Sequence, residues 1–182
     1  MRTTDCPDTT LLISLLILLT VSSITDIRER RIPNWITYST ILFSILYHTG
    51  CQGMEGLSFS LKGLGIGLGA FLPFYFLGML GAGDVKLMGA IGAILGFKGT
   101  LNALCYSVIL GGIYGVIILL LNRAQLKSFI DRLKIMIRML FVTGRFVYIP
   151  PSCEDGEIRM CYGLTIAFGT INYVLLVYIG WY

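Results

Sequence analysis

Asp26 and Asp84 are the two residues whose type and setting most directly suggest chemistry. Asp26 follows one strongly apolar segment, and Asp84 precedes another within Gly81-Ala-Gly-Asp-Val-Lys. A carboxylate at the edge of membrane depth is energetically costly and is usually functional. Two carboxylates within a few ångströms of each other share a proton and titrate as a coupled pair. One can then activate a water molecule while the other polarises a peptide carbonyl, which hydrolyses an amide without a metal or a cofactor.

The sequence offers no convincing alternative machinery. Its single histidine, His48, is predicted on the opposite side of the molecule from both aspartates, and no HExxH or GxSxG pattern occurs. The five cysteines form no CxxC pair, so neither a zinc site nor a disulfide framework is supported. Each aspartate also has a simpler explanation: Asp84 could cap the start of a helix, and Asp26 could lie at the interface where a span ends.

The elements that position these residues are predicted to lie in a membrane. Of 182 residues, 55% are hydrophobic and 13% are charged, and the mean hydropathy is +0.80. A soluble domain of this composition would have to hide far too much apolar surface. The net charge of +4 is modest and its basic residues concentrate in connecting segments, so nucleic acid is not expected as a partner.

Six apolar segments qualify as membrane spans, since a bilayer core of about 30 Å takes about 20 residues per helix. They are Thr10–Thr25, Asn34–Thr49, Leu61–Leu80, Val85–Phe97, Leu101–Asn122 and Tyr162–Trp181. The fourth and fifth are separated only at Lys98 and Gly99, so they could form a tight hairpin. The first has no cleavage-site pattern after it and is therefore interpreted as a transmembrane helix. The predicted fold class is an all-α polytopic membrane bundle, forming a single domain over residues 1–182.

Loop charge predicts the orientation of these spans. Ile27–Pro33 holds three arginines and one glutamate, and Arg123–Arg159 holds seven basic and four acidic residues. Basic loops stay on the cytoplasmic side, which places the N-terminus and the Gly50–Ser60 loop outside and both aspartates at the cytoplasmic face. Residues 123–143 alternate charged and apolar side chains with a helical period, which predicts an amphipathic helix lying in the bilayer interface.

Glycine is abundant, with 22 residues, and has two predicted roles. Gly81 and Gly83 are predicted to shape the site, because glycine adopts backbone conformations closed to other residues and leaves room beside the carboxylate. Other glycines recur four residues apart, a spacing that lets helix backbones approach closely in lipid. These pairs are Gly63/Gly67, Gly65/Gly69, Gly92/Gly96 and Gly111/Gly115.

Taken together, three motifs resemble the type IV prepilin peptidases, a branch of the GxGD membrane aspartyl proteases. They are Asp26 with Arg28 and Ile32-Pro33-Asn34, then Gly81-Ala-Gly-Asp84-Val-Lys86, and finally Tyr162-Gly163 through Gly169. The third is similar to the family's last span, although Cys161 stands where proline is common. The likeness covers nearly the whole chain in order and spacing. It implies that Asp26 and Asp84 are catalytic and that Gly81 and Gly83 shape the site.

The resemblance also implies a substrate and a location. The expected reaction is cleavage of the short basic leader from prepilin-like or pseudopilin-like precursors, at the cytoplasmic face of the inner membrane and without a metal or cofactor. Larger members N-methylate the new terminus and carry an insertion with paired CxxC motifs, whereas only Ile27–Pro33 separates the first two spans here. A peptidase without a methyltransferase domain is therefore expected. Lys86 belongs to the same motif, but it lies about 200° around a helix from Asp84, so an interfacial anchor or supporting role is expected.

Three alternatives stay open at this point. Archaeal preflagellin peptidases share the aspartate pair. A small proton- or cation-coupled transporter could use the same two carboxylates, although a relay would normally continue with further ionisable groups toward the bilayer midplane, and none is found there. A catalytically silent assembly factor would keep the fold without needing both aspartates.

Overall fold

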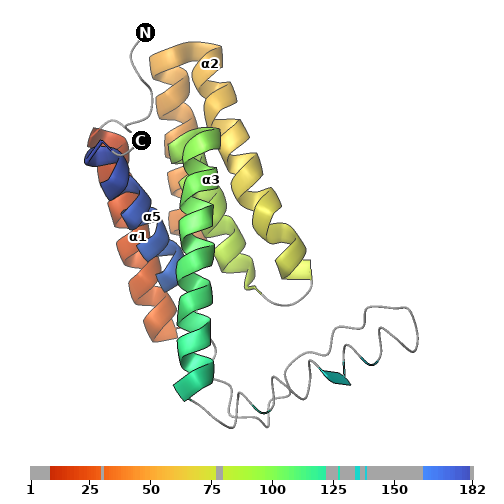
Figure 1. The fold of residues 1–182 in the computed structure, drawn as a ribbon. Coiled ribbons are helices and arrows are strands. Elements are labelled where there is room, and N and C mark those ends of the chain that lie inside the picture. Colours follow the sequence, from red (N-terminus) through yellow and green to blue (C-terminus); the bar gives the residue numbers. More distant parts are fainter. Residues whose placement is uncertain are drawn as a thin grey trace. The chain divides into compact units, whose positions relative to one another are not determined.

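We describe the fold from a computed structural model, which covers residues 9–29, 31–76, 80–121 and 162–180 together with residues 127, 134, 135 and 138. The regular structure of these residues is entirely helical, without strands. The helices are α1 (Thr9–Glu29), α2 (Asn34–Phe76), α3 (Ala82–Leu121) and α5 (Tyr162–Tyr178) (Figure 1). The predicted all-α class is confirmed. Most of the predicted amphipathic segment 123–143 lies outside the described residues, as do Cys161 and Trp181.

Three helices, α1, α2 and α3, are long and apolar enough to cross a membrane, and α5 is an apolar helix of 17 residues. In α1, Leu11 and Leu15 are buried while Ile13 and Leu16 are exposed, so the helix is apolar all round. Such a helix is suited to protein on one side and lipid on the other. Within the described residues the chain is therefore all-helical, and its long apolar helices support a membrane location. Two of the four elements, α2 and α3, each contain two helical arms joined at a non-helical glycine, and six separate membrane spans stay a prediction.

The helix α2 folds back on itself at Gly53, whose backbone has φ 60° and ψ −135°. The hydroxyls of Ser44 and Ser60 both donate to the carbonyl of Ala93, at 2.7 and 2.9 Å. In a straight helix these two serines would lie about 24 Å apart, so the two arms of α2 must run side by side, as Figure 1 shows. The predicted loop at Gly50–Ser60 is therefore wrong: its residues are helical, and a single glycine makes the turn.

The helix α3 has a similar bend at Gly96, with φ 67° and ψ −172°. The predicted boundary at Lys98 and Gly99 was thus placed slightly too late. A helix that breaks leaves the carbonyls of its last turn without helical partners. Here Ala93 receives the two serine hydroxyls, and the carbonyl of Ile94 lies 3.3 Å from Nε2 of buried His48. Polar side chains of α2 therefore bind the backbone carbonyls that are left free where the first arm of α3 ends.

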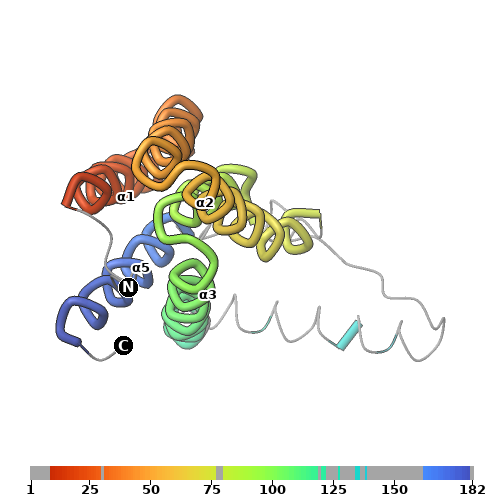
Figure 2. Tube along the Cα trace, turned by 90° about the horizontal axis from the view of Figure 1, so that it is seen from above, coloured from red at the N-terminus to blue at the C-terminus, as the bar shows by residue number. Residues whose placement is uncertain are grey.

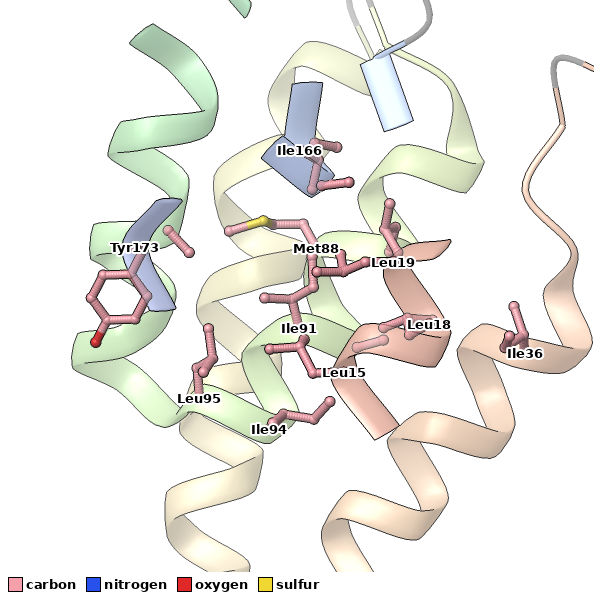
Figure 3. Packing of buried hydrophobic residues seen from close by; sticks show 14 of the residues in the cluster. Leu15, Leu18, Leu19, Ile36, Met88, Ile91, Ile94, Leu95, Ile166 and Tyr173 are labelled. Carbon is pink, nitrogen blue, oxygen red and sulfur yellow. The ribbon is translucent and has the colours of Figure 1, made fainter. Parts of the chain in front are cut away.

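The core that joins the helices is built from apolar side chains of all four (Figure 3). Leu15 and Leu19 of α1 meet Met88 and Ile91 of α3, with Ile166 of α5 beside them. Viewed from above, α1 is flanked by α2 and α5 (Figure 2), and it contacts both of them. This packing sets the carboxyl end of α1 against the amino end of α5.

Glycines bring the second arm of α2 against the first arm of α3. A Cβ added to Gly63 would lie 1.9 Å from the carbonyl oxygen of Gly92, and one added to Gly67 would lie 2.3 Å from that of Met88. The predicted close approach is confirmed at these glycines. It is wrong at Gly65 and Gly69, where an added Cβ would meet nothing within 4 Å. Therefore only the face of α2 that carries Gly63 and Gly67 packs against another helix, and the face that carries Gly65 and Gly69 does not.

The chain divides into two compact units, Met1–Gly111 with Cys161–Tyr182, and Gly112–Met160. The first contains α1, α2, α5 and α3 up to Gly111, together with every site residue discussed below. The described part of the second consists mainly of the end of α3. The single domain expected from the sequence stays a prediction.

Candidate active site

Asp26 lies in the last turn of α1 and is 8% exposed. It continues the buried face of that helix, since Leu15, Leu18 and Ser22 precede it at helical spacing. Its carboxylate is held from another helix: the backbone amide of Gly163, at the amino end of α5, donates to Oδ2 at 3.0 Å. The packing of α5 against α1 therefore decides where this carboxylate lies.

Asp84 lies in the first turn of α3 and is also 8% exposed. Its Oδ2 accepts a hydrogen bond of 3.2 Å from the amide of Gly81, and its own amide donates to the Gly81 carbonyl at 3.1 Å. The first of these bonds is one half of a capping box, in which the third residue of a helix reaches back to the amide of the residue before its start. Gly81 has no side chain to make the other half. Asp84 is thus not the capping residue itself, and Gly81 occupies that position.

The two carboxylates line the same cavity, which has a volume of about 320 Å³. The other lining residues are Arg31, Ile32, Asn34, Gly81, Ala82, Gly83 and Lys86. The prediction that Asp26 and Asp84 come together is confirmed, although they arise from different helices. Their catalytic role stays a prediction, because geometry alone does not test it. The cavity can hold a peptide group and a water molecule, which takes about 30 Å³.

Gly81 and Gly83 both line this cavity, but the reason given for them from the sequence is partly wrong. Among the described glycines only Gly53, Gly96 and Gly180 have positive φ, so neither site glycine adopts a backbone conformation closed to other residues. A Cβ on Gly83 would lie 3.1 Å from Cβ of Ile32, and one on Gly81 would lie 3.2 Å from Oδ2 of Asp84. Both positions are therefore tight, and what glycine provides there is space.

Lys86 also lines the cavity, despite lying on a different face of α3 from Asp84 in the sequence analysis. Its Nζ donates to Oδ1 of Asn34 at 3.0 Å and lies 5.2 Å from the centre of the Tyr38 ring. Asn34 is the first residue of α2. The lysine therefore links the amino ends of α2 and α3 and keeps a positive charge beside the two carboxylates.

Two contact residues were not assigned a role from the sequence, namely Gly163 and Asn34. Both belong to motifs on which the family resemblance rests, and that resemblance was the only feature of the sequence that could have pointed to them. No group of three or more His, Cys, Asp or Glu side chains within the described ranges is placed to hold a metal ion. The expectation of a metal-free reaction stays a prediction.

Comparison with known proteins shows to which family the chain belongs. Residues 13–116 match the type IV leader peptidase family, a range that includes both aspartates and every other residue that lines the cavity. The chain belongs to this family. It is 35% identical over 114 residues to the prepilin leader peptidase/N-methyltransferase of Bacillus subtilis (strain 168), covering 58% of this chain and 43% of that protein. The chain thus spans less than half the length of this relative of the leader peptidase family. No solved structure matches it.

Proposed function

We propose that the chain is an aspartic endopeptidase of the membrane that removes the short basic leader from type IV prepilin-like or pseudopilin-like precursors. The observation that carries this proposal is the pair of largely buried carboxylates, Asp26 and Asp84, on one cavity of about 320 Å³. Membership of the leader peptidase family and the similarity to a prepilin leader peptidase/N-methyltransferase of Bacillus subtilis support the substrate class.

In the proposed reaction the two aspartates share one proton. The ionised carboxylate takes a proton from a water molecule, whose oxygen attacks the carbonyl carbon of the scissile bond, while the protonated carboxylate donates to the carbonyl oxygen. Collapse of the tetrahedral intermediate breaks the C–N bond. The leaving amine takes the proton that the first carboxylate had removed from water, and a hydroxyl of the intermediate gives its proton to the second carboxylate, which restores the shared proton. Gly81 and Gly83 leave room beside Asp84 for the peptide.

The proposed setting is the inner membrane, with the cavity at the cytoplasmic face. The bends at Gly53 and Gly96 are proposed as the outer turns of two helical hairpins, so that the two arms of α2, the two arms of α3, α1 and α5 make six spans. The basic Ile27–Pro33 connection lies beside the cavity through Arg31 and Ile32 and supports this orientation. The whole bundle is proposed to act as one peptidase domain in contact with lipid, without methyltransferase activity.

The transporter using the same aspartates receives no support from the family comparison, which matches a peptidase. The two proposals also differ in what the cavity must do. A hydrolase needs its carboxylates at one end of the bundle, where a leader outside the bilayer can reach them, whereas a relay needs groups that continue across it. The cavity lies at the carboxyl end of α1 and the amino ends of α2 and α3, which favours the peptidase.

Co-expression with candidate prepilins from the same genome tests the proposed function directly. We expect the precursor to become shorter by its basic leader, which a size shift and the sequence of the new amino terminus would show. A precursor whose basic leader is replaced by a neutral one is the control. If every candidate keeps its original length beside the folded wild-type protein, the peptidase proposal is wrong.

Lys86 is proposed as a supporting residue of the site and not only as an interfacial anchor. Replacing it with methionine keeps an unbranched side chain, one atom shorter, but removes its hydrogen bond to Asn34 and its charge over Tyr38. We expect leader cleavage to slow by roughly threefold to tenfold, because one hydrogen bond contributes about 0.5–1.5 kcal/mol net. The exposed Lys62, on the second arm of α2, provides the control variant Lys62→Met. Equal initial rates of leader cleavage for the two variants in proteoliposomes would show that Lys86 does not support the reaction.

A further inference from the structure

The carboxylates of the candidate site are held in different ways. Asp84 is bound within its own turn, by the amide of Gly81 only three residues away. Asp26 is bound by the amide of Gly163, which is 137 residues away in the sequence. The geometry of Asp26 therefore depends on a separate helix, α5, whereas that of Asp84 is local.

Residue 163 has almost no space for a side chain. A Cβ added there would lie 2.8 Å from Oδ2, 3.2 Å from Cγ and 3.3 Å from Cβ of Asp26. Carbon and oxygen atoms attract each other only at separations well above these, and closer contact forces the groups apart. Because all three nearest atoms belong to Asp26, the absence of a side chain at Gly163 makes room first of all for this aspartate.

We propose that the amino end of α5 is a positioning element for Asp26. The backbone amide of Gly163 holds one carboxylate oxygen, and the missing Cβ lets the carboxylate come within hydrogen-bonding distance. Gly163 is a positioning residue and takes no part in the chemical steps. The kinetic consequence rests on the proposed function, in which Asp26 is catalytic, but the contact itself does not.

The matched variants are Gly163→Ala and Gly169→Ala, which make the same change on the same helix. A Cβ at Gly169 would also overlap, but with Ser107 of α3, at 2.4 Å from its Oγ. Gly169→Ala therefore disturbs the packing of α5 without touching Asp26. This comparison separates a general defect of α5 from the loss of a positioned carboxylate.

The kinetic test measures leader cleavage by each full-length variant in proteoliposomes. We expect Gly163→Ala to lower kcat on the order of a hundredfold with KM unchanged, since a misplacement of about 1 Å has this effect on a reacting group. Gly169→Ala should keep kcat within a few-fold of the wild type. A wild-type kcat for Gly163→Ala, or equal losses for both variants, would overturn the proposal.

A second test uses stability and needs no activity. We expect Gly163→Ala to lower Tm by roughly 2–4 °C in the wild type, and by much less in an Asp26→Ala background, where the side chain that it displaces is gone. The effect of Gly169→Ala should be the same in both backgrounds. An equal loss of Tm for Gly163→Ala with and without the Asp26 side chain would contradict the contact. If the wild type cleaves no precursor, the proposed function fails while this cycle still decides the contact.

Discussion

We expect that replacing either Asp26 or Asp84 with asparagine abolishes leader cleavage. Asparagine keeps the size of the side chain and an oxygen that can accept the amide hydrogen bonds of Gly163 or Gly81. It cannot carry or release the shared proton. The activation of water needs an ionised carboxylate and the protonation of the carbonyl oxygen needs a protonated one, so we expect a loss of about 10⁴-fold or more in kcat/KM.

The measurement compares cleavage rates of purified variants reconstituted with a prepilin, and the amount of each variant in the membrane is followed in parallel. Glu55→Gln is the matched control, because Glu55 is exposed on α2 and does not line the cavity. It should cleave at the wild-type rate. Should either aspartate variant process the precursor as fast as Glu55→Gln, the two-carboxylate mechanism would have to be abandoned.

The second large effect concerns the glycine contact between α2 and α3. Gly63→Ala places a Cβ 1.9 Å from the carbonyl oxygen of Gly92, and a backbone carbonyl cannot turn aside as a flexible side chain can. The helices must separate, which also moves the arm that carries Asp84. Overpacking of this kind costs roughly 3 kcal/mol, which lowers Tm by about 6–12 °C for a chain of this size.

The control for this prediction lies two residues away on the same helix. In Gly65→Ala the new Cβ points into open space. The variant should be as stable as the wild type or slightly more stable, because alanine has a higher helix propensity than glycine. Thermal unfolding in the same detergent compares the variants. Equal Tm values for Gly63→Ala and Gly65→Ala would show that the close crossing of the two helices does not contribute to stability.

Much of the local structure of this protein is predictable from its sequence. Continuous apolar segments predicted the helices, and the two acidic residues at their edges stood out because so few charges lie near membrane depth. The basic loops, counted without reference to the aspartates, placed both at one end of the bundle. The cavity that they share confirms that placement.

The turns were predicted less well, for a reason visible between Gly50 and Gly56. Low hydropathy there predicted a loop, although a polar segment outside the bilayer can stay helical. Gly50, Gly53 and Gly56 were equivalent candidates for the turn. Only in the folded chain does Gly53 take the positive φ, while Gly56 packs so that an added Cβ would lie 2.0 Å from the carbonyl oxygen of His48.

The sequence by itself determined that the chain is helical, that it belongs in a membrane, and that Asp26 and Asp84 are its candidate catalytic residues. Those properties depend on hydrophobicity and charge, which each segment carries whatever its neighbours are. Tertiary structure alone decided that Gly163 holds Asp26, that Gly83 faces Ile32 and that Lys86 binds Asn34. These contacts join different segments, and they form only when apolar faces and glycines have set the distances between helices.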